Sequence, residues 1–270
     1  MQAGLTARRA CRIMGLSTSM LAEPKPAAQD EQNQELQRRL REVLRPGLGY
    51  RMARALVLPA WNAEFGPLNT KRVHRVWRAC QFSLSKKKGT KRRTGNTVPL
   101  AATRPNQVWC LDFCHDACLN GTVLKVLALK DEYTRECLAL EVACGLNSFA
   151  VRRVVEAAIE EYGAPAFLRS DNGPEFIAGH LGVWLQTQGT QTRFIKPGSP
   201  WQNGHAESFM ARLRAECLDA EVFLNLNDAR LKLEVFRRYY NQCRPHSALG
   251  YIPPAQFALN LKQQTQQEGG

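Results

Sequence analysis

The sequence predicts an α/β protein with a mixed β-sheet, preceded by a small helical region. Two observations support this prediction. Beyond residue 107, apolar runs and turn signals give the order β-β-β-α-β-α-β-α, so that a meander of three strands precedes alternating strands and helices. In the part before it, three segments carry apolar residues at helical spacing. A chain of 270 residues is long enough for one large domain or two modest ones.

The net charge is divided unequally between these two parts. Residues 1–107 hold 21 basic and 6 acidic side chains, a net charge of +15, whereas residues 108–270 have a net charge of −2. A basic region joined to a nearly neutral one indicates a polyanion-binding module followed by a domain with another task. An ordinary solvated basic surface is the alternative. The size of the asymmetry favours nucleic acid as the partner.

Two classes of protein are excluded by the composition. No uncharged apolar run approaches the roughly 18–20 residues that a membrane helix requires. Residues 1–24 imitate a signal peptide only weakly, because Arg12 interrupts their apolar part. The nine cysteines include no Cys-x-x-Cys pair, which fits free thiols in a reducing compartment better than a disulfide framework. We therefore expect a cytoplasmic protein with no membrane partner.

Three helices are expected in the basic region. The first spans 30–45, and the second spans 51–58 and ends at Pro59. The third spans 70–81, with Asn69 as its N-cap. Its apolar stripe leaves four basic side chains outside, which we expect to contact DNA: Lys71, Arg72, Arg75 and Arg78. The arrangement is compatible with a helix-turn-helix, although amphipathic basic helices also occur without any ligand.

A basic tract without hydrophobic residues follows the third helix. Its charged members are Lys86, Lys87, Lys88, Lys91, Arg92 and Arg93. Such a tract predicts a flexible linker whose charges meet DNA phosphates, and a linker that is merely solvated is the alternative.

The nearly neutral region begins with three strands, expected at 109–114, 123–129 and 137–142, with a hairpin turn at Asn120-Gly121. A helix capped by Asn147 or Ser148 comes next. A strand at 166–170, a helix at 176–188, a strand at 190–195 and a helix at 204–218 complete the region.

Three acidic residues stand out by their positions in this order. Asp112 lies inside the first strand, Asp171 ends the fourth, and Glu207 opens the helix after the fifth. The first and fourth strands of a mixed sheet can be neighbours, which brings the two aspartates together, and a helix packed beside them delivers the glutamate. Carboxylates driven together repel one another unless a divalent cation neutralises them. We therefore expect these acids to be the catalytic residues and metal ligands of a two-metal phosphoryl-transfer site.

Each acid alone has a simpler interpretation, as a turn residue, a helix-dipole partner or a surface charge. This simpler interpretation fits Asp112 least well, because burying an unpaired acid inside an apolar strand is costly. Arg214 lies about 20° from Glu207 around the expected helix, which places a guanidinium near a bound phosphate, a solvated arginine being the alternative. Asn203 is expected in a loop or cap that touches DNA. Four nearby residues could be considered as zinc ligands: Cys110, Cys114, Cys118 and His115. We favour instead that the cysteines are small buried thiols that pack in the core.

These acids and their surroundings resemble a known family. Asp112, Asp171 and Glu207, with 35 residues between the last two, resemble the D,D-35-E signature of retroviral integrases and related transposases. The flanking segments are similar to the second-reading-frame products of bacterial insertion sequences that move by a copy-out, paste-in route. The segments are WCLDF at 109–113, SDNGPEF at 170–176, PWQNGHAESF at 200–209 and RPHSALGY at 244–251. The resemblance covers about 47–257.

The resemblance implies an RNase H-like core, in which a mixed five-stranded sheet carries helices on both faces. It implies that Asp112, Asp171 and Glu207 hold Mg²⁺ or Mn²⁺, as two ions, and that Arg214 positions a phosphate. The implied reaction is DNA strand cleavage followed by strand transfer. The implied partners are element ends, target DNA, further copies of the chain on DNA, and an upstream-frame product or fusion. An RNase H-type nuclease and a catalytically silent DNA-binding regulator from a decayed element are the alternatives.

Six segments are expected along the chain. They are a polar segment at 1–28, a helix-turn-helix-like region at 29–82, a basic linker at 83–103, the catalytic core at 104–225, a helical extension at 226–260 and a disordered tail at 261–270.

Overall fold

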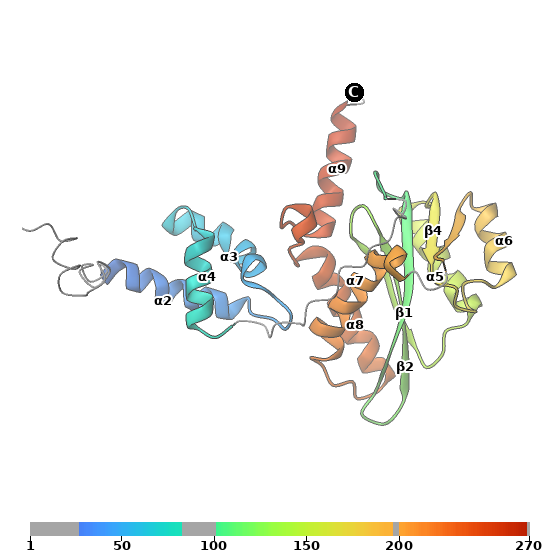
Figure 1. Ribbon diagram of the computed structural model, residues 1–270, viewed down its shortest axis with the longest axis horizontal. Coiled ribbons are helices and arrows are strands. Elements are labelled where there is room, and N and C mark those ends of the chain that lie inside the picture. Colours follow the sequence, from blue (N-terminus) through green and yellow to red (C-terminus); the bar gives the residue numbers. More distant parts are fainter. Residues whose placement is uncertain (1–26, 83–100, 197–199, 269–270) are drawn as a thin grey trace, which may run out of the picture.

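The computed structural model describes residues 27–82, 101–196 and 200–268. Figure 1 shows a small helical unit at one end of the molecule and a β-sheet at the other, with the carboxyl-terminal helices between them. The six expected DNA contacts at 86–93 lie outside the described residues. Within those described ranges, no helix has the length and apolar character needed to cross a membrane.

The helical unit consists of α2 (Ala27–Glu42), α3 (Tyr50–Phe65) and α4 (Thr70–Ala79). Burial of apolar side chains from all three helices holds it together, and the largest of them are Leu36, Leu40, Trp61 and Trp77. The predicted N-cap is confirmed, because the Asn69 side chain accepts a hydrogen bond from the backbone N–H of Lys71 at 2.8 Å.

The prediction that the second helix ends at Pro59 is wrong. Helix α3 continues through Pro59 to Phe65. An internal proline costs roughly 3 kcal/mol because it removes one backbone hydrogen bond and crowds the preceding turn. Continuing the helix brings Trp61 into the core, where it is 1% exposed, and stacks it at 4.6 Å on Phe65. Burial of such large aromatic surface opposes the cost of the proline.

The sheet is built from β1 (Val108–Ala117), β2 (Val123–Asp131), β3 (Cys137–Ala143), β4 (Phe167–Ser170) and β5 (Gln191–Phe194). Its strand order is β3-β2-β1-β4-β5. β1 is antiparallel to β2 and parallel to β4, so the expected mixed five-stranded sheet is confirmed. The hairpin turn between β1 and β2 falls at Asn120-Gly121, as predicted, and Gly121 has the positive φ of 81° that such turns require.

Helices cover both faces of the sheet (Figure 1). One face packs against α5 (Ser148–Tyr162) and α6 (Gly179–Thr187), and the other against α7 (Gly204–Leu213) and α8 (Leu226–Gln242). Side chains of a strand alternate between its faces. Trp109 and Leu111 pack with α5 and α6, so Asp112 points to the face that α7 covers.

Two of the predicted helices have different bounds in the structure. Helix α6 begins at Gly179 rather than at residue 176, because Phe176 is buried and stacks on Phe113 with ring centroids 4.9 Å apart. The helix expected at 204–218 is α-helical only to Leu213 and continues as a π-helix at Arg214–Leu218.

The carboxyl-terminal segment also differs from its prediction. Where a disordered tail at 261–270 was expected, α9 (Pro254–Glu268) continues to Glu268. The helix is anchored at its start, where Phe257 meets the ring of Tyr133 at 5.9 Å. Four of its last six residues, 263–268, are Gln, which loses little freedom in a helix.

Candidate active site

The three predicted acids come from three different elements that meet at one place. Asp112 lies within β1, Asp171 directly follows β4, and Glu207 lies in the first turn of α7. β1 and β4 are parallel neighbours whose pairing ends at Cys110 and Arg169. Asp112 and Asp171 each lie two residues beyond the Cys110–Arg169 pair and on the same side of the sheet as that pair. Helix α7 packs on the same face of β1, which brings Glu207 to them.

The electrostatics of Asp112 report how close the acids are. Burial and, to a smaller extent, the negative charges of Asp171 and Glu207 together raise the pKa of Asp112 to about 6. A hydrogen bond from the backbone N–H of Phe113 to the Asp112 carboxylate, at 2.9 Å, acts in the opposite direction and is outweighed. The three carboxylates therefore repel one another, and a cation between them relieves that repulsion.

The donors suit a hard divalent cation in kind and in charge. The Asp171 carboxylate accepts a hydrogen bond from the backbone N–H of Gly173 at 3.0 Å, so each aspartate has one oxygen held by the backbone. Within the described part of the chain, no three His, Cys, Asp or Glu side chains are drawn together tightly enough to hold a metal ion. Closing around an ion therefore requires the carboxylates to turn toward one another.

The loop that carries Asp171 is fixed to the sheet by contacts of Glu175 and Phe176. Glu175 forms an ion pair with Lys125 of β2, which holds the pKa of Glu175 below its ordinary value. The Lys125 ammonium lies 4.2 Å from the ring centroid of Phe113, which in turn stacks on Phe176 of the loop. The ion pair and the stacked rings join residues 50 and 63 positions apart, and no local pattern in the sequence indicates them.

Asn203 lies at the start of α7. It is only 3% exposed, and its amide donates a hydrogen bond at 3.2 Å to the carbonyl of Leu111, the residue before Asp112. A direct contact between Asn203 and DNA stays a prediction. Asn203 ties the start of α7 to β1, beside two of the three acids.

Arg214 lies at the junction of α7 and the π-helix. Its guanidinium donates a hydrogen bond at 3.0 Å to the carbonyl of His115 and lies 3.7 Å from a carboxylate oxygen of Asp219. The side chain is about half exposed, over the half of β1 that follows Asp112. A phosphate bound there remains a prediction.

The predicted DNA contacts of α4 separate into two groups. Arg72 donates hydrogen bonds to Asn33 at 3.0 Å and to Gln32 at 2.9 Å, and it lies over the ring of Trp61. It therefore holds α4 against α2 and α3, and a DNA contact of this half-buried side chain stays a prediction. The other three side chains are exposed, and for them DNA contact stays a prediction: Lys71, Arg75 and Arg78.

The cysteines on β1 are free thiols, and burial raises the pKa of Cys110 far above its ordinary value and that of Cys114 to about 11. A protonated buried thiol is a poor metal ligand. Cys110 and Cys118 are buried, as expected of thiols that pack in the core.

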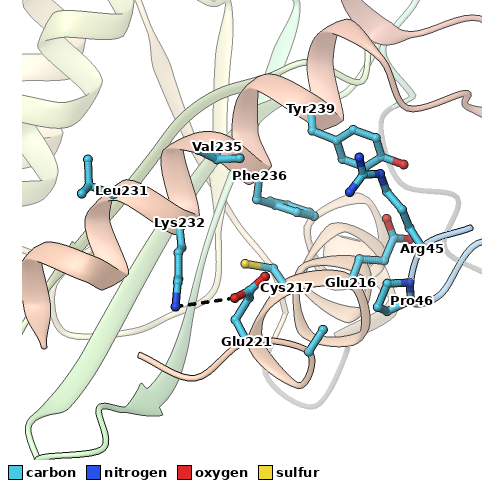
Figure 2. A pocket seen from close by; sticks show the side chains of 11 residues that line it. Arg45, Pro46, Glu216, Cys217, Glu221, Leu231, Lys232, Val235, Phe236 and Tyr239 are labelled. Carbon is cyan, nitrogen blue, oxygen red and sulfur yellow. Dashed lines mark ion pairs between the residues drawn. The ribbon is translucent and has the colours of Figure 1, made fainter. Parts of the chain in front are cut away.

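A cavity of about 330 Å³ lies away from the acids, between the α2–α3 loop, the π-helix and α8 (Figure 2). There the Arg45 guanidinium lies over the Tyr239 ring, 4.9 Å from its centroid. Glu216 of the π-helix accepts two hydrogen bonds from the buried Arg244, at 2.6 and 2.7 Å. Gly47 approaches Glu216 so closely that an added Cβ would lie 2.6 Å from its Cγ. This joint holds the helical unit against the segment that follows Arg214.

Comparisons with known proteins agree with this geometry. Two models described as "Integrase core domain" match residues 102–200 and 188–254. A solved relative in fold is a chain of the simian T-cell lymphotropic virus intasome in complex with the PP2A regulatory subunit B56 gamma. It has a TM-score of 0.53 and 15% identity, over 75% of this chain and 73% of that one. The fold and the meeting of acids on it define an integrase-type catalytic core with an RNase H-like sheet.

Curated relatives narrow this class. The chain is 38% identical to the "Insertion element IS476 uncharacterized 39.2 kDa protein" of Xanthomonas euvesicatoria, over 96% of this chain and 74% of that protein. It is 36% identical to the corresponding IS407 protein of Burkholderia multivorans, over 94% and 91%. It is 31% identical to the transposase InsD of insertion element IS2 of Escherichia coli, over 78% and 73%. The chain belongs to the transposases of bacterial insertion sequences, a family of polynucleotidyl transferases.

Proposed function

We propose that this transposase cuts and joins DNA strands at a divalent-metal site formed by Asp112, Asp171 and Glu207. The observation that carries the proposal is the convergence of these carboxylates from β1, β4 and α7, whose mutual repulsion contributes to the raised pKa of Asp112. Two Mg²⁺ or Mn²⁺ ions bound there supply activation of the attacking oxygen and stabilisation of charge at the leaving oxygen.

The residues of the chain perform the remaining tasks. Asp112 and Asp171 present their carboxylates from the rigid sheet, and Glu207 presents its own from α7, which Asn203 fastens to β1. Arg214 binds a phosphate of the DNA from the half of β1 beyond Asp112. Water attacks first and releases a 3′-hydroxyl at the element end, with the other DNA strand segment leaving as its 5′-phosphate. That hydroxyl then attacks a second phosphodiester in line, whose bond to its own 3′-oxygen breaks and leaves a new 3′-hydroxyl, and the protein forms no covalent bond to DNA.

The helical unit supplies affinity for DNA. Lys71, Arg75 and Arg78 are exposed on α4 and contact phosphates, which gives affinity without sequence information. The solved relative in fold is an intasome, and we extend to this chain the expectation that several copies act together on element ends and target DNA. An upstream-frame product, or a fusion to it, completes the recognition of the ends.

A strand-transfer assay tests the proposal. The full chain is incubated with Mg²⁺ and a labelled duplex that carries the end of its insertion sequence. We expect labelled products longer than the substrate strand, formed with Mg²⁺ or Mn²⁺ and lost with excess chelator. Shortened products alone would show a plain nuclease, and no product with either ion would show a silent DNA-binding regulator.

Asp116→Asn is a matched control, because Asp116 lies on the same strand as Asp112 and its carboxylate also accepts from the next backbone N–H, at 2.8 Å. It lies four residues further along β1 and is half-buried, and we expect its variant to be fully active.

A further inference from the structure

A buried layer of charged and polar side chains lies beneath the three acids. Cys110, Arg169 and His205 each precede one of the acids by two residues. In the sheet register, Cys110 is the partner of both Lys130 on β2 and Arg169 on β4, so these three form one row across the sheet. That row lies one pleat away from Asp112 and Asp171, on the face that α7 covers.

Glu132 is the carboxylate at the centre of this layer. It follows β2, and its backbone N–H donates to the carbonyl of Val108 at 2.9 Å, which fixes it at the start of β1. Its side chain is 0% exposed. One carboxylate oxygen, Oε1, accepts a hydrogen bond from Arg169 at 2.7 Å, and the other, Oε2, lies 3.9 Å from Nε2 of His205. A single side chain therefore reaches the strand that leads to Asp171 and the helix that carries Glu207.

The ring of His205 fits this arrangement as a neutral group. One guanidinium nitrogen of Arg135 contacts Nδ1 of His205 and lies 3.2 Å from its Nε2. Since a guanidinium only donates, the ring must offer it an unprotonated nitrogen and is therefore neutral. The Oε2 of Glu132 is buried without another hydrogen-bond partner in the described part of the chain, so a small rotation closes its contact with His205.

The charges around Glu132 explain why a carboxylate is needed there. Lys130 and Arg169 are both buried, and Arg135 is half-buried. Isolated buried cations are costly, and a nearby anion compensates them. The neighbouring Asp131 is not available for this, because its oxygens accept from the backbone N–H groups of Asn106 at 2.7 Å and Tyr133 at 2.7 Å.

We infer that Glu132 is a positioning residue of the active site, which sets the separation of Asp171 and Glu207 by holding Arg169 on β4 and His205 on α7. It touches neither DNA nor metal and acts through those two side chains. The inference rests on the proposed metal-binding roles of Asp171 and Glu207. Partners that orient metal ligands from outside the ligand set typically contribute about 10- to 100-fold in metal affinity or activity.

The test is a titration of the full chain with Mn²⁺ in the absence of DNA. The electron paramagnetic resonance signal of the free ion measures how much Mn²⁺ remains unbound. Two variants are informative. Glu132→Gln keeps the shape and removes the charge, whereas Glu132→Asp keeps the charge and shortens the reach. We expect Mn²⁺ affinity to fall at least about tenfold in Glu132→Gln and several-fold in Glu132→Asp. Glu160→Gln, at an exposed position on α5, is the control and should bind like the parent.

Parent-like affinity in a folded Glu132→Gln protein would overturn the inference. Parent-like affinity in Glu132→Asp would do so too, because it would show that charge alone, and not the span to Arg169 and His205, matters. If Glu132→Gln does not fold, Glu132→Asp decides the question by itself. Asp171→Asn separates the two proposals, since undiminished Mn²⁺ binding in that variant would overturn the metal site rather than the role of Glu132.

Discussion

Asp112→Asn should stabilise the metal-free protein, because the Asp112 carboxylate is held in an environment that disfavours its charge. Burial and the two neighbouring acids raise its pKa from 3.8 to about 6. A shift of roughly two units, at 1.36 kcal/mol each, corresponds to about 3 kcal/mol lost from the folded state when Asp112 is ionised. Allowing for partial solvent screening, we expect a gain of about 1–3 kcal/mol in the variant at pH 8. The asparagine still accepts the hydrogen bond from Phe113, so only the charge is removed.

The dependence of this gain on pH has a definite sign. The folded-state pKa lies above the unfolded value, so the folded protein binds the proton more tightly. The destabilisation of the parent is therefore full above about pH 6 and disappears as the pH falls toward 3.8. The difference in unfolding free energy between variant and parent should be large at pH 8 and small near pH 4.

Urea unfolding of the full chain in excess chelator measures both effects. The control is Asp116→Asn, whose carboxylate makes the same bond to its own neighbouring N–H but lies four residues further along β1, and it should change stability by less than about 0.5 kcal/mol. Adding Mg²⁺ should stabilise the parent and not Asp112→Asn. A variant that is no more stable than the parent at pH 8 would refute the crowding of carboxylates around Asp112.

Three further predictions follow from other parts of the molecule. DNA affinity should fall steeply with salt and differ less than about a hundredfold between an element end and a scrambled duplex. Replacing Arg75 or Arg78 should make affinity depend less steeply on salt concentration, and an unchanged dependence would exclude them as phosphate contacts. Ca²⁺ should support assembly on DNA with little turnover, because it prefers a looser and larger oxygen shell than Mg²⁺, and rapid turnover in Ca²⁺ would contradict the metal model. Gly47→Ala should cost about 1–3 kcal/mol, since Gly47 has φ +73° and its Cβ would lie 2.6 Å from Glu216, whereas Gly49→Ala meets nothing within 4 Å. Equal thermal stability of the two alanine variants would contradict the close joint.

Much of the fold and the position of the acids could be predicted from local patterns. Hydrophobic periodicity and turn residues locate the strands, and their order makes β1 and β4 neighbours. That adjacency alone places Asp112 beside Asp171. Asn69 and Asn147 were predictable as caps because a side chain and a backbone N–H two or three residues away suffice to form them.

Features that depend on distant contacts could not be predicted from local patterns. Arg72 and Asn203 are polar residues whose partners lie 39 and 92 positions away, so these contacts leave no local signal. Helix α3 continues past Pro59 because Trp61, which follows it, is buried in the core of the helical unit. The change from α-helix to π-helix at Arg214 also has no signal in the local sequence.

Glu132 was missed for the same reason. Its neighbours in the sequence form a turn around Asp131, and that local role explains the segment sufficiently. Its link to Arg169, 37 positions away, exists only once the sheet has formed.

The most direct test of the active site is strand transfer by Glu207→Gln, measured beside the parent chain on one labelled insertion-sequence end with Mg²⁺. The glutamine has the shape of the glutamate and lacks its charge, so the fold, checked by circular dichroism, and DNA binding should be kept. Loss of a metal ligand should remove several kcal/mol of transition-state stabilisation, and we expect neither cleaved nor joined product. The exposed Glu160→Gln variant should remain as active as the parent. Activity of Glu207→Gln within tenfold of the parent would contradict the assignment of Glu207, and with it the carboxylate site.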